Sequence, residues 1–260
     1  MMQPALTKNI IKSIKQLEMR KFRRRDGLFI AEGTKLVSDN LGSMKCRHLI
    51  ATAEWWQRHP EARNVAEEAF LVTEQELERV SLQPTPQEVL GTFYIPTPEL
   101  DIEHLSKRLT IALDDIQDPG NLGTIIRLCD WFGITDIVCS PHTTDCYSPK
   151  VVQASMGAIS RVKVHYTPLS EFLEEMSRRG VAICGTFLNG ENLYTAPLPS
   201  SKAVIIMGNE GQGISPEVER KVTKRITIPS FAPVGESGSE SLNVSIATAI
   251  VVSEFCRRTL

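Results

Sequence analysis

Two apolar runs in the last third of the chain each end in a loop rich in glycine and serine. The first run, residues 203–207, continues into a glycine-rich turn at residues 208–213. The second, residues 225–229, leads into a loop and then into an apolar helix that we expect to end near residue 258. Such runs are typical of parallel strands, and ligands bind at the carboxyl edge of open α/β sheets. We therefore expect a ligand site where these loops meet.

Short apolar runs alternate with helical patterns along the rest of the chain, which indicates an α/β fold with a mostly parallel sheet. A segment rich in proline and acidic residues, residues 96–101, is typical of a linker. We expect a smaller N-terminal α/β domain over residues 1–97 and a larger domain over residues 105–260. Hydrophobic residues make up 42% of the 260-residue chain, which suffices for packed cores in both.

The formal net charge of -2 conceals an uneven distribution of charge. Between residues 8 and 25, eight lysines and arginines face a single acid, Glu18. From residue 54 to residue 103 glutamates dominate instead, and only three arginines oppose them. Eight bases against one acid exceed what solubility requires, so the pattern indicates one basic face for a polyanion.

The six cysteines show no C-x-x-C pairing, and several lie in apolar runs, so we interpret them as reduced, buried thiols. The first apolar residues are interleaved with lysines, which is unlike a signal peptide. No apolar run approaches the length of a membrane span. We expect a soluble cytoplasmic protein with no membrane partner.

Three segments of the second domain carry polar residues and glycines. They are residues 118–127, residues 207–213, and residues 228–229 together with 241–245. In this order they resemble the three motifs of the SpoU/TrmH family of RNA ribose 2′-O-methyltransferases, members of the SPOUT superfamily. The segment from residue 20 to residue 33 resembles the family's N-terminal RNA-binding domain, which has a ribosomal-protein-like fold.

The resemblance implies a trefoil knot in the C-terminal domain, with S-adenosylmethionine bound in the knot loops. Physical reasoning alone would not propose a knot, because true knots are nearly absent among folds. The positions at which the family holds this cofactor through backbone groups are Gly208, Ile228 and Leu242. The polar positions of the three motifs, which we take as candidate catalytic residues, are Asn121, Arg127, Glu210, Ser241 and Asn243.

The implied chemistry needs a cation near the ribose hydroxyl, and it needs no metal ion. A ribose hydroxyl is a poor nucleophile, and a nearby cation would stabilise the oxyanion that develops during methyl transfer. Arg127 is the candidate for this role, but a guanidinium is effectively always protonated and makes a poor base. Ser241, Glu210 or an RNA phosphate could accept the proton, and these alternatives stay open.

Each candidate residue also has a purely structural interpretation. A glycine turn can simply join a strand to a helix, Asn121 can cap its helix, and an arginine such as Arg127 is usually a surface residue. A nucleotide-dependent oxidoreductase should show G-x-G-x-x-G after an early strand, with an acid about 20 residues further on, and neither stands in that context. A non-catalytic RNA-binding protein of the same fold would lack the polar motif residues, which are all present.

We therefore expect a two-domain enzyme that transfers a methyl group from S-adenosylmethionine to a ribose 2′-hydroxyl of RNA. Ribosomal RNA is favoured over transfer RNA as the substrate. The preference for ribosomal RNA follows from the resemblance. A homodimer is expected as well, since Val244, Ala247, Ile250, Val251 and Phe255 recur at helical spacing and the family pairs through its knotted domain. The acidic loop 230–240 is longer than the usual family link, so the resemblance does not extend to its role.

Overall fold

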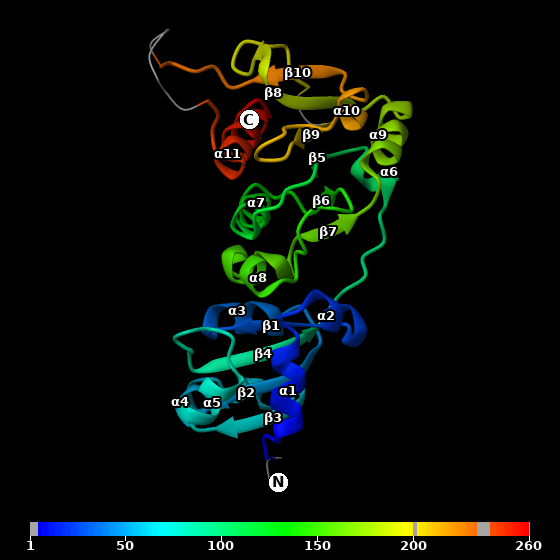
Figure 1. The fold of residues 1–260 in the computed structure, drawn as a ribbon. Coiled ribbons are helices and arrows are strands. Elements are labelled where there is room, and N and C mark those ends of the chain that lie inside the picture. Colours follow the sequence, from blue (N-terminus) through cyan, green and yellow to red (C-terminus); the bar gives the residue numbers. More distant parts are fainter. Residues whose placement is uncertain (1–4, 200–201, 233–239, 260) are drawn as a thin grey trace. The chain divides into compact units, whose positions relative to one another are not determined.

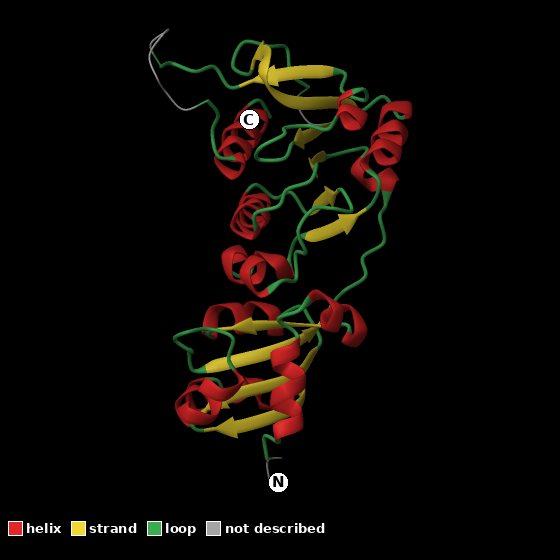
Figure 2. Ribbon diagram, viewed as in Figure 1, coloured by secondary structure: helices red, strands yellow, loops and turns green. Residues whose placement is uncertain are grey.

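A computed structural model describes residues 5–199, 202–232 and 240–259, apart from the side chain of residue 63. The chain forms two compact units (Figure 1). The N-terminal unit comprises Met1–Thr97 and Asp145–Arg161, and the C-terminal unit comprises Pro98–Thr144 and Val162–Leu260. Each unit has a sheet covered by helices, which confirms the predicted α/β class (Figure 2).

The N-terminal unit is built on a four-stranded sheet in the order β1-β4-β2-β3. Strand β4 (Val89–Tyr94) pairs antiparallel with both β1 (Leu28–Glu32) and β2 (Cys46–Thr52), and β2 pairs parallel with β3 (Ala66–Val72). All five residues of β1 are buried, as expected for a strand with both faces covered. The helices of this unit are α1 (Lys8–Gln16), α2 (Arg20–Asp26), α3 (Thr34–Leu41), α4 (Ala53–Arg58), α5 (Glu74–Val80) and α8 (Pro149–Ser155), with 3-10 turns η1 (Pro60–Asn64) and η2 (Ala158–Ser160).

The basic N-terminal segment forms two separate helices, α1 and α2. At the break, the guanidinium of Arg23 donates to the carbonyl groups of Leu17 and Glu18, both at 2.7 Å. The same guanidinium forms a 2.6 Å ion pair with Asp145. Arg23 therefore holds the turn between α1 and α2.

Residues 145–161 leave the C-terminal sheet after β6 and belong to the N-terminal unit. Besides Asp145, they bring the ring of Tyr147 to 4.9 Å from the ring of Phe29 in β1. Helix α8 packs on β1, and Val151 and Val152 are buried there. Dividing the chain at residue 97 alone would separate this segment from the unit in which it packs.

The C-terminal unit has a six-stranded sheet in the order β10-β8-β9-β5-β6-β7. Every neighbouring pair is parallel, so the predicted parallel sheet is confirmed. Its strands are β5 (Leu109–Leu113), β6 (Asp136–Cys139), β7 (Lys163–Tyr166), β8 (Ala182–Asn192), β9 (Ala203–Met207) and β10 (Lys224–Thr227). The trefoil knot implied by the family resemblance stays a prediction.

Helices cover both faces of this sheet. On one face α9 (Leu169–Arg178) packs its apolar stripe against β8 and β9, while α7 (Pro119–Trp131) and α11 (Val244–Arg257) pack together on the other face (Figure 1). Two short helices, α6 (Ile102–Leu105) and α10 (Pro216–Glu219), complete the unit. None of the helices in the described ranges has both the length and the apolarity that crossing a bilayer requires.

Candidate active site at the carboxyl edge of the parallel sheet

Strands β5 and β9 lie side by side in parallel and end in register, Leu113 opposite Met207. The loops that follow them therefore start from the same edge of the sheet. Asp114 fixes this arrangement, because its backbone N–H donates to the Met207 carbonyl at 2.9 Å and its buried carboxylate accepts from the N–H of Ser215 at 2.7 Å.

The glycine-rich turn at residues 208–213 is closed by hydrogen bonds within itself. Asn209 and Gly213 exchange two backbone hydrogen bonds of 2.9 Å. The side-chain oxygen of Asn209 accepts from the N–H groups of Gly211 and Gln212 at 2.9 and 3.0 Å. A Cβ atom on Gly208 would lie 2.3 Å from the backbone of Gly213, so only glycine fits there.

Asn121, Glu210 and Asn243 form one hydrogen-bonded chain. The Nδ2 atom of Asn121 donates to a Glu210 carboxylate oxygen at 3.0 Å, and the Nδ2 atom of Asn243 donates to Oδ1 of Asn121 at 2.9 Å. Backbone N–H groups of Gln117 and Asp118 also donate to the Glu210 carboxylate, both at 3.2 Å. All three predicted motif segments thus meet at this edge of the sheet.

Asn121 and Asn243 differ in that only Asn243 caps a helix. Asn121 does not cap α7, because Asp118 accepts from the Asn121 N–H at 2.8 Å and Pro119 follows at the first helical position. Asn243 does cap α11, since its Oδ1 atom accepts from the N–H of Ser245 at 2.9 Å. An aspartate before a proline is a helix-start signal that sequence reasoning could have used at residue 118.

The electrostatics of Glu210 make it a poor proton acceptor. Desolvation raises the pKa of Glu210, but hydrogen bonds from the Asn121 side chain and from backbone N–H groups outweigh that effect and lower the pKa below the ordinary glutamate value. These donors hold the carboxylate in its ionised form. The arrangement favours Glu210 as an anchor for the motif loops.

Arg127 lies apart from this network. It is six positions after Asn121 on α7, about one and two-thirds turns, so the two side chains leave different sides of the helix. Its side chain is exposed, and no ion pair or hydrogen bond joins it to another described residue. Four residues further on, the side chain of Trp131 is 84% exposed.

Ser241 and Leu242 lie immediately before the capping residue of α11. Both are exposed, and the Ser241 hydroxyl makes no hydrogen bond to the rest of the described chain. The acidic loop that precedes them falls largely on residues 233–239, which lie outside the described residues. The structure therefore places Ser241 beside the Asn243 end of the network without joining it to that network.

Three loops present backbone groups that could recognise a cofactor. In the described part of the chain, no hydrogen bond uses the backbone N–H or C=O of Gly208 or Leu242, or the N–H of Ile228. Such groups at the carboxyl edge of a sheet can bond to the polar atoms of a ligand, which fits a cofactor held by main chain rather than by charged side chains. Among the described residues no cluster of histidine, cysteine, aspartate or glutamate could hold a metal ion.

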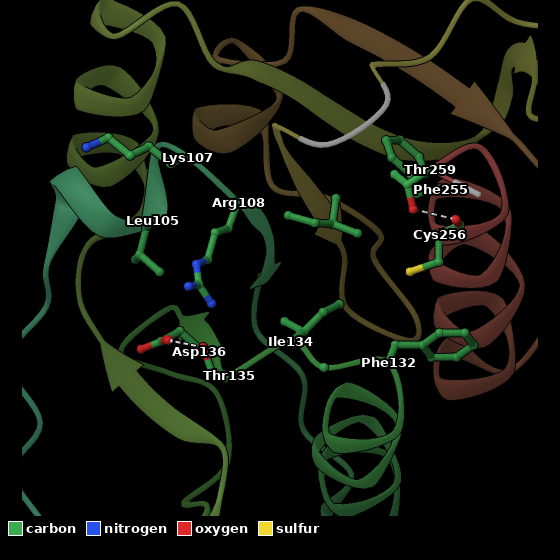
Figure 3. A pocket seen from close by; sticks show the side chains of 12 residues that line it. Leu105, Lys107, Arg108, Phe132, Ile134, Thr135, Asp136, Phe255, Cys256 and Thr259 are labelled. Carbon is green, nitrogen blue, oxygen red and sulfur yellow. Dashed lines mark hydrogen bonds between the residues drawn. The ribbon is translucent and has the colours of Figure 1, made fainter.

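A cavity of about 370 Å³ lies at the other edge of this sheet (Figure 3). Its wall includes Arg108 and Asp136, at the starts of β5 and β6, and Phe255 near the end of α11. It contains none of the predicted site residues. The cavity is therefore separate from the candidate active site.

The basic N-terminal segment is exposed except at one position. Arg23 is only 3% exposed and is committed to Leu17, Glu18 and Asp145, so it cannot serve as a phosphate contact. Arg25 pairs with the neighbouring Asp26 at 2.6 Å. The remaining bases of the segment keep exposed side chains without an ion pair to the described residues: Lys8, Lys12, Lys15, Arg20, Lys21 and Arg24.

Comparison with known families gives a match to each unit. Residues 108–253 match the SpoU rRNA methylase family, and residues 8–91 match the MRM3-like substrate binding domain. The first match covers more than half of the chain and includes every predicted site residue.

Among known proteins, the chain is 28% identical over 243 residues to 23S rRNA (guanosine(2553)-2′-O)-methyltransferase RlmP of Bacillus subtilis, covering 93% of this chain and 94% of that protein. A solved structure from Porphyromonas gingivalis, of a protein assigned to the TrmH family of RNA methyltransferases, is 42% identical with a TM-score of 0.88, covering 98% of this chain and 100% of that one. An rRNA methyltransferase from Sinorhizobium meliloti with bound AdoMet is 31% identical with a TM-score of 0.84, covering 98% and 97%.

Proposed function

Because this chain belongs to the SpoU rRNA methylase family, we propose that it transfers a methyl group from S-adenosylmethionine to a ribose 2′-hydroxyl of RNA. The observation that carries the proposal is the hydrogen-bonded chain of Asn121, Glu210 and Asn243, which joins the three motif segments. A non-catalytic RNA-binding protein would not need these side chains. The AdoMet-bound Sinorhizobium meliloti structure supports the same methyl donor.

The backbone groups of Gly208 and Leu242 and the N–H of Ile228 are the proposed cofactor contacts, because they make no bond within the described chain that a ligand would have to break. S-adenosylmethionine, when bound, supplies an electrophilic methyl group on a sulfonium. The closed turn at residues 208–213 holds Gly208 in place, and Asn121 ties that turn to α7 through Glu210. Preorganised contacts of this kind avoid the cost of ordering a loop when the cofactor binds.

Arg127 is the proposed cation at the reacting hydroxyl. Its guanidinium is exposed and has no partner among the described residues, so an RNA ribose or phosphate can approach it without displacing a bond. A fixed positive charge near the ribose oxygen would stabilise the negative charge that develops as the O–H proton leaves.

The proton acceptor is proposed to be Ser241 or a phosphate oxygen of the RNA. Glu210 is the least suitable of the three candidates, because its pKa is lowered and its oxygens already accept several hydrogen bonds. Ser241 is exposed beside Asn243 with a hydroxyl that makes no other bond in the described chain.

Ribosomal RNA is the proposed substrate. The Bacillus subtilis relative is named for 23S ribosomal RNA, and the match to it extends over 93% of this chain, including both units. The match to a substrate-binding domain over residues 8–91 supports a role of the N-terminal unit in holding that RNA. A large RNA present in ribosomes is met in the cytoplasm, which is the proposed location.

A homodimer formed through α7 and α11 is also proposed. The residues that first indicated it are mostly core, since Val244, Val251 and Phe255 are buried within their own unit. The exposed apolar side chains are instead Trp131 on α7 and Ile246 on α11, which are 84% and 52% exposed. Large exposed apolar side chains on neighbouring elements mark an interaction surface.

Methyl transfer to RNA in vitro tests the proposed function. Purified protein is incubated with radiolabelled S-adenosylmethionine and ribosomal RNA that lacks its modifications, and the labelled nucleosides are then identified. We expect label in a 2′-O-methylated nucleoside. Label in a base, or no label with either ribosomal or transfer RNA, would contradict the proposal.

A further inference from the structure

One face of α1 carries a stripe of cations that form no ion pair within the described chain. Lys8, Lys12 and Lys15 follow one another at helical spacing and are exposed. Arg79 on α5 lies beside them. Within the described chain none of these four side chains takes part in an ion pair.

Other lysines of the same unit are paired. Lys35 lies 3.1 Å from Asp39, and Lys45 lies 2.6 Å from Glu67. Exposed lysines therefore do find acids in this unit where acids are near. The cations on α1 form no ion pair of this kind in the described chain. Burial raises the pKa of Glu32 and the charge of Lys15 only partly opposes that effect, so the exposed stripe still presents a positive surface to an external anion.

The stripe borders a groove with an apolar floor. The groove has a volume of about 620 Å³ and is lined by the four cations together with Ile11, Gln16 and Met19. None of its described lining residues is acidic. Met19 is 47% exposed there.

We propose that this groove holds an unpaired nucleotide of the RNA, with its phosphates on Lys8, Lys12, Lys15 and Arg79 and its base against Ile11 and Met19. The proposal rests on the proposed function, because it presumes that the chain binds RNA. Proteins bind single strands by combining a positive groove, which follows the backbone, with side chains, usually aromatic, on which the bases stack. Here the cations of α1 and α5 supply the positive groove, and Ile11 and Met19 offer an apolar surface for the base.

Duplex RNA fits these features less well. A duplex presents phosphates and riboses but keeps its bases stacked inside, so it would leave the floor at Met19 uncovered. A membrane surface fits less well too, because the main apolar residues of this segment, Ile14 and Leu17, are buried in the core. Unpaired RNA uses both the cations and the apolar floor.

Binding of two RNA probes to the full chain tests this proposal. The probes are a fluorescent unstructured oligoribonucleotide and a blunt duplex of the same length, each titrated at several salt concentrations. The rim variant is Lys12→Gln with Lys15→Gln, and its matched control is Lys35→Gln with Lys45→Gln. The floor variant is Met19→Ala, which changes no charge.

The parent should bind the unpaired probe more tightly than the duplex. The rim variant should bind the unpaired probe more weakly than the parent does. The slope of its log affinity against log salt concentration should be smaller by roughly 0.7 for each single-strand phosphate that it no longer neutralises. The control variant should keep the slope of the parent. Met19→Ala should weaken binding of the unpaired probe several-fold, keep the salt slope, and leave duplex binding unchanged.

Parent-like binding by both groove variants would overturn the proposal, as would an equal reduction in affinity for both probes in Met19→Ala. Methyl transfer to ribosomal RNA, measured with the same proteins, distinguishes a failure of the groove assignment from a failure of the proposed function. If the parent methylates ribose but the groove variants bind as the parent does, only the groove assignment fails. If the parent neither binds RNA nor methylates it, the proposed function fails with it.

Discussion

The side-chain amide of Asn121 donates to the Glu210 carboxylate at 3.0 Å, a hydrogen bond between residues 89 positions apart in the sequence. It connects the first turn of α7 to the glycine-rich turn after β9. Because the same Asn121 side chain accepts from Asn243, one amide links all three motif segments. The alignment of the proposed site depends on this one side chain more than on any other.

Asn121→Asp should therefore disturb the whole site. The variant keeps the shape of the side chain but replaces the donor with an acceptor beside the Glu210 carboxylate. We expect a decrease of about 1–3 kcal/mol in the free energy of unfolding, as for an unsatisfied buried polar group, and a large fall in methyl transfer. Urea unfolding and turnover measured on one preparation check this. Parent values for both quantities would show that the link is dispensable.

The pH dependence of stability should show the contribution of Glu210. The folded-state pKa of Glu210 is lowered, so the ionised carboxylate stabilises the fold. This contribution to the free energy of unfolding is fully present above the ordinary glutamate pKa of 4.5, and it is lost as the pH falls through the folded-state pKa. Glu210→Gln lacks this contribution. The difference in unfolding free energy between parent and variant should be constant near neutral pH and shrink on acidification below about 4.5. A difference that grows in acid would contradict the assigned shift.

Arg127→Ala should reduce turnover without harming the fold. The side chain is exposed and makes no bond to the described chain, so the free energy of unfolding should change by less than about 0.5 kcal/mol. Removal of one preorganised transition-state interaction should lower kcat by about 100-fold to 1,000-fold, with S-adenosylmethionine affinity nearly intact. Arg127→Lys should rescue poorly because the planar guanidinium is absent. Methylation by Arg127→Ala at the parent rate would remove Arg127 from the mechanism.

Gly208→Ala should weaken cofactor binding more than RNA binding. A Cβ atom at this position would lie 2.3 Å from the backbone of Gly213 and Ile214, so the turn that presents the Gly208 backbone must shift. Gly211→Ala is the matched control, because a Cβ atom there would meet only the Asn209 side chain, at 3.7 Å. Calorimetry with each ligand separately checks the order of effects. Equal cofactor affinity in the two variants would mean that the turn does not contact the cofactor.

Arg23 and Arg24 should behave differently although they are adjacent in the basic segment. Arg23→Ala breaks an ion pair between a buried guanidinium and the half-buried carboxylate of Asp145, which should cost up to about 3–5 kcal/mol of unfolding free energy. Arg24→Ala should keep the stability of the parent, because Arg24 is exposed and without a partner in the described chain, and should weaken RNA binding. Denaturant unfolding and RNA titration of both variants decide the matter. Similar stabilities for the two would show that the Arg23 pair is not structural.

The family, the α/β class and the parallel sheet were predictable because they depend on local patterns. The runs that became β5 and β9 are apolar and bounded by turn residues, and the motif residues are few and specific. The convergence of Asn121, Glu210 and Asn243 followed from the rule that the carboxyl ends of parallel strands share one edge.

Features that depend on tertiary contacts were not predictable in the same way. The periodicity of residues 145–161 indicates a helix but not the unit in which it packs, which is set by contacts with Phe29 and Arg23. Charge counting likewise treated Arg23 as one of eight equal bases, although burial gives it a structural role. Of the stripe on α11, Val244, Val251 and Phe255 lie in the core while Ala247 and Ile250 are half-buried, because helical spacing alone does not show which side of a helix faces the core.

Mapping ribose methylation across total RNA, in cells with and without this protein, tests the central claim most directly. The account predicts that one or a few 2′-O-methyl groups of ribosomal RNA disappear without the protein, return with the parent chain, and do not return with Arg127→Ala. An unchanged map of ribose methylation in both ribosomal and transfer RNA would contradict it.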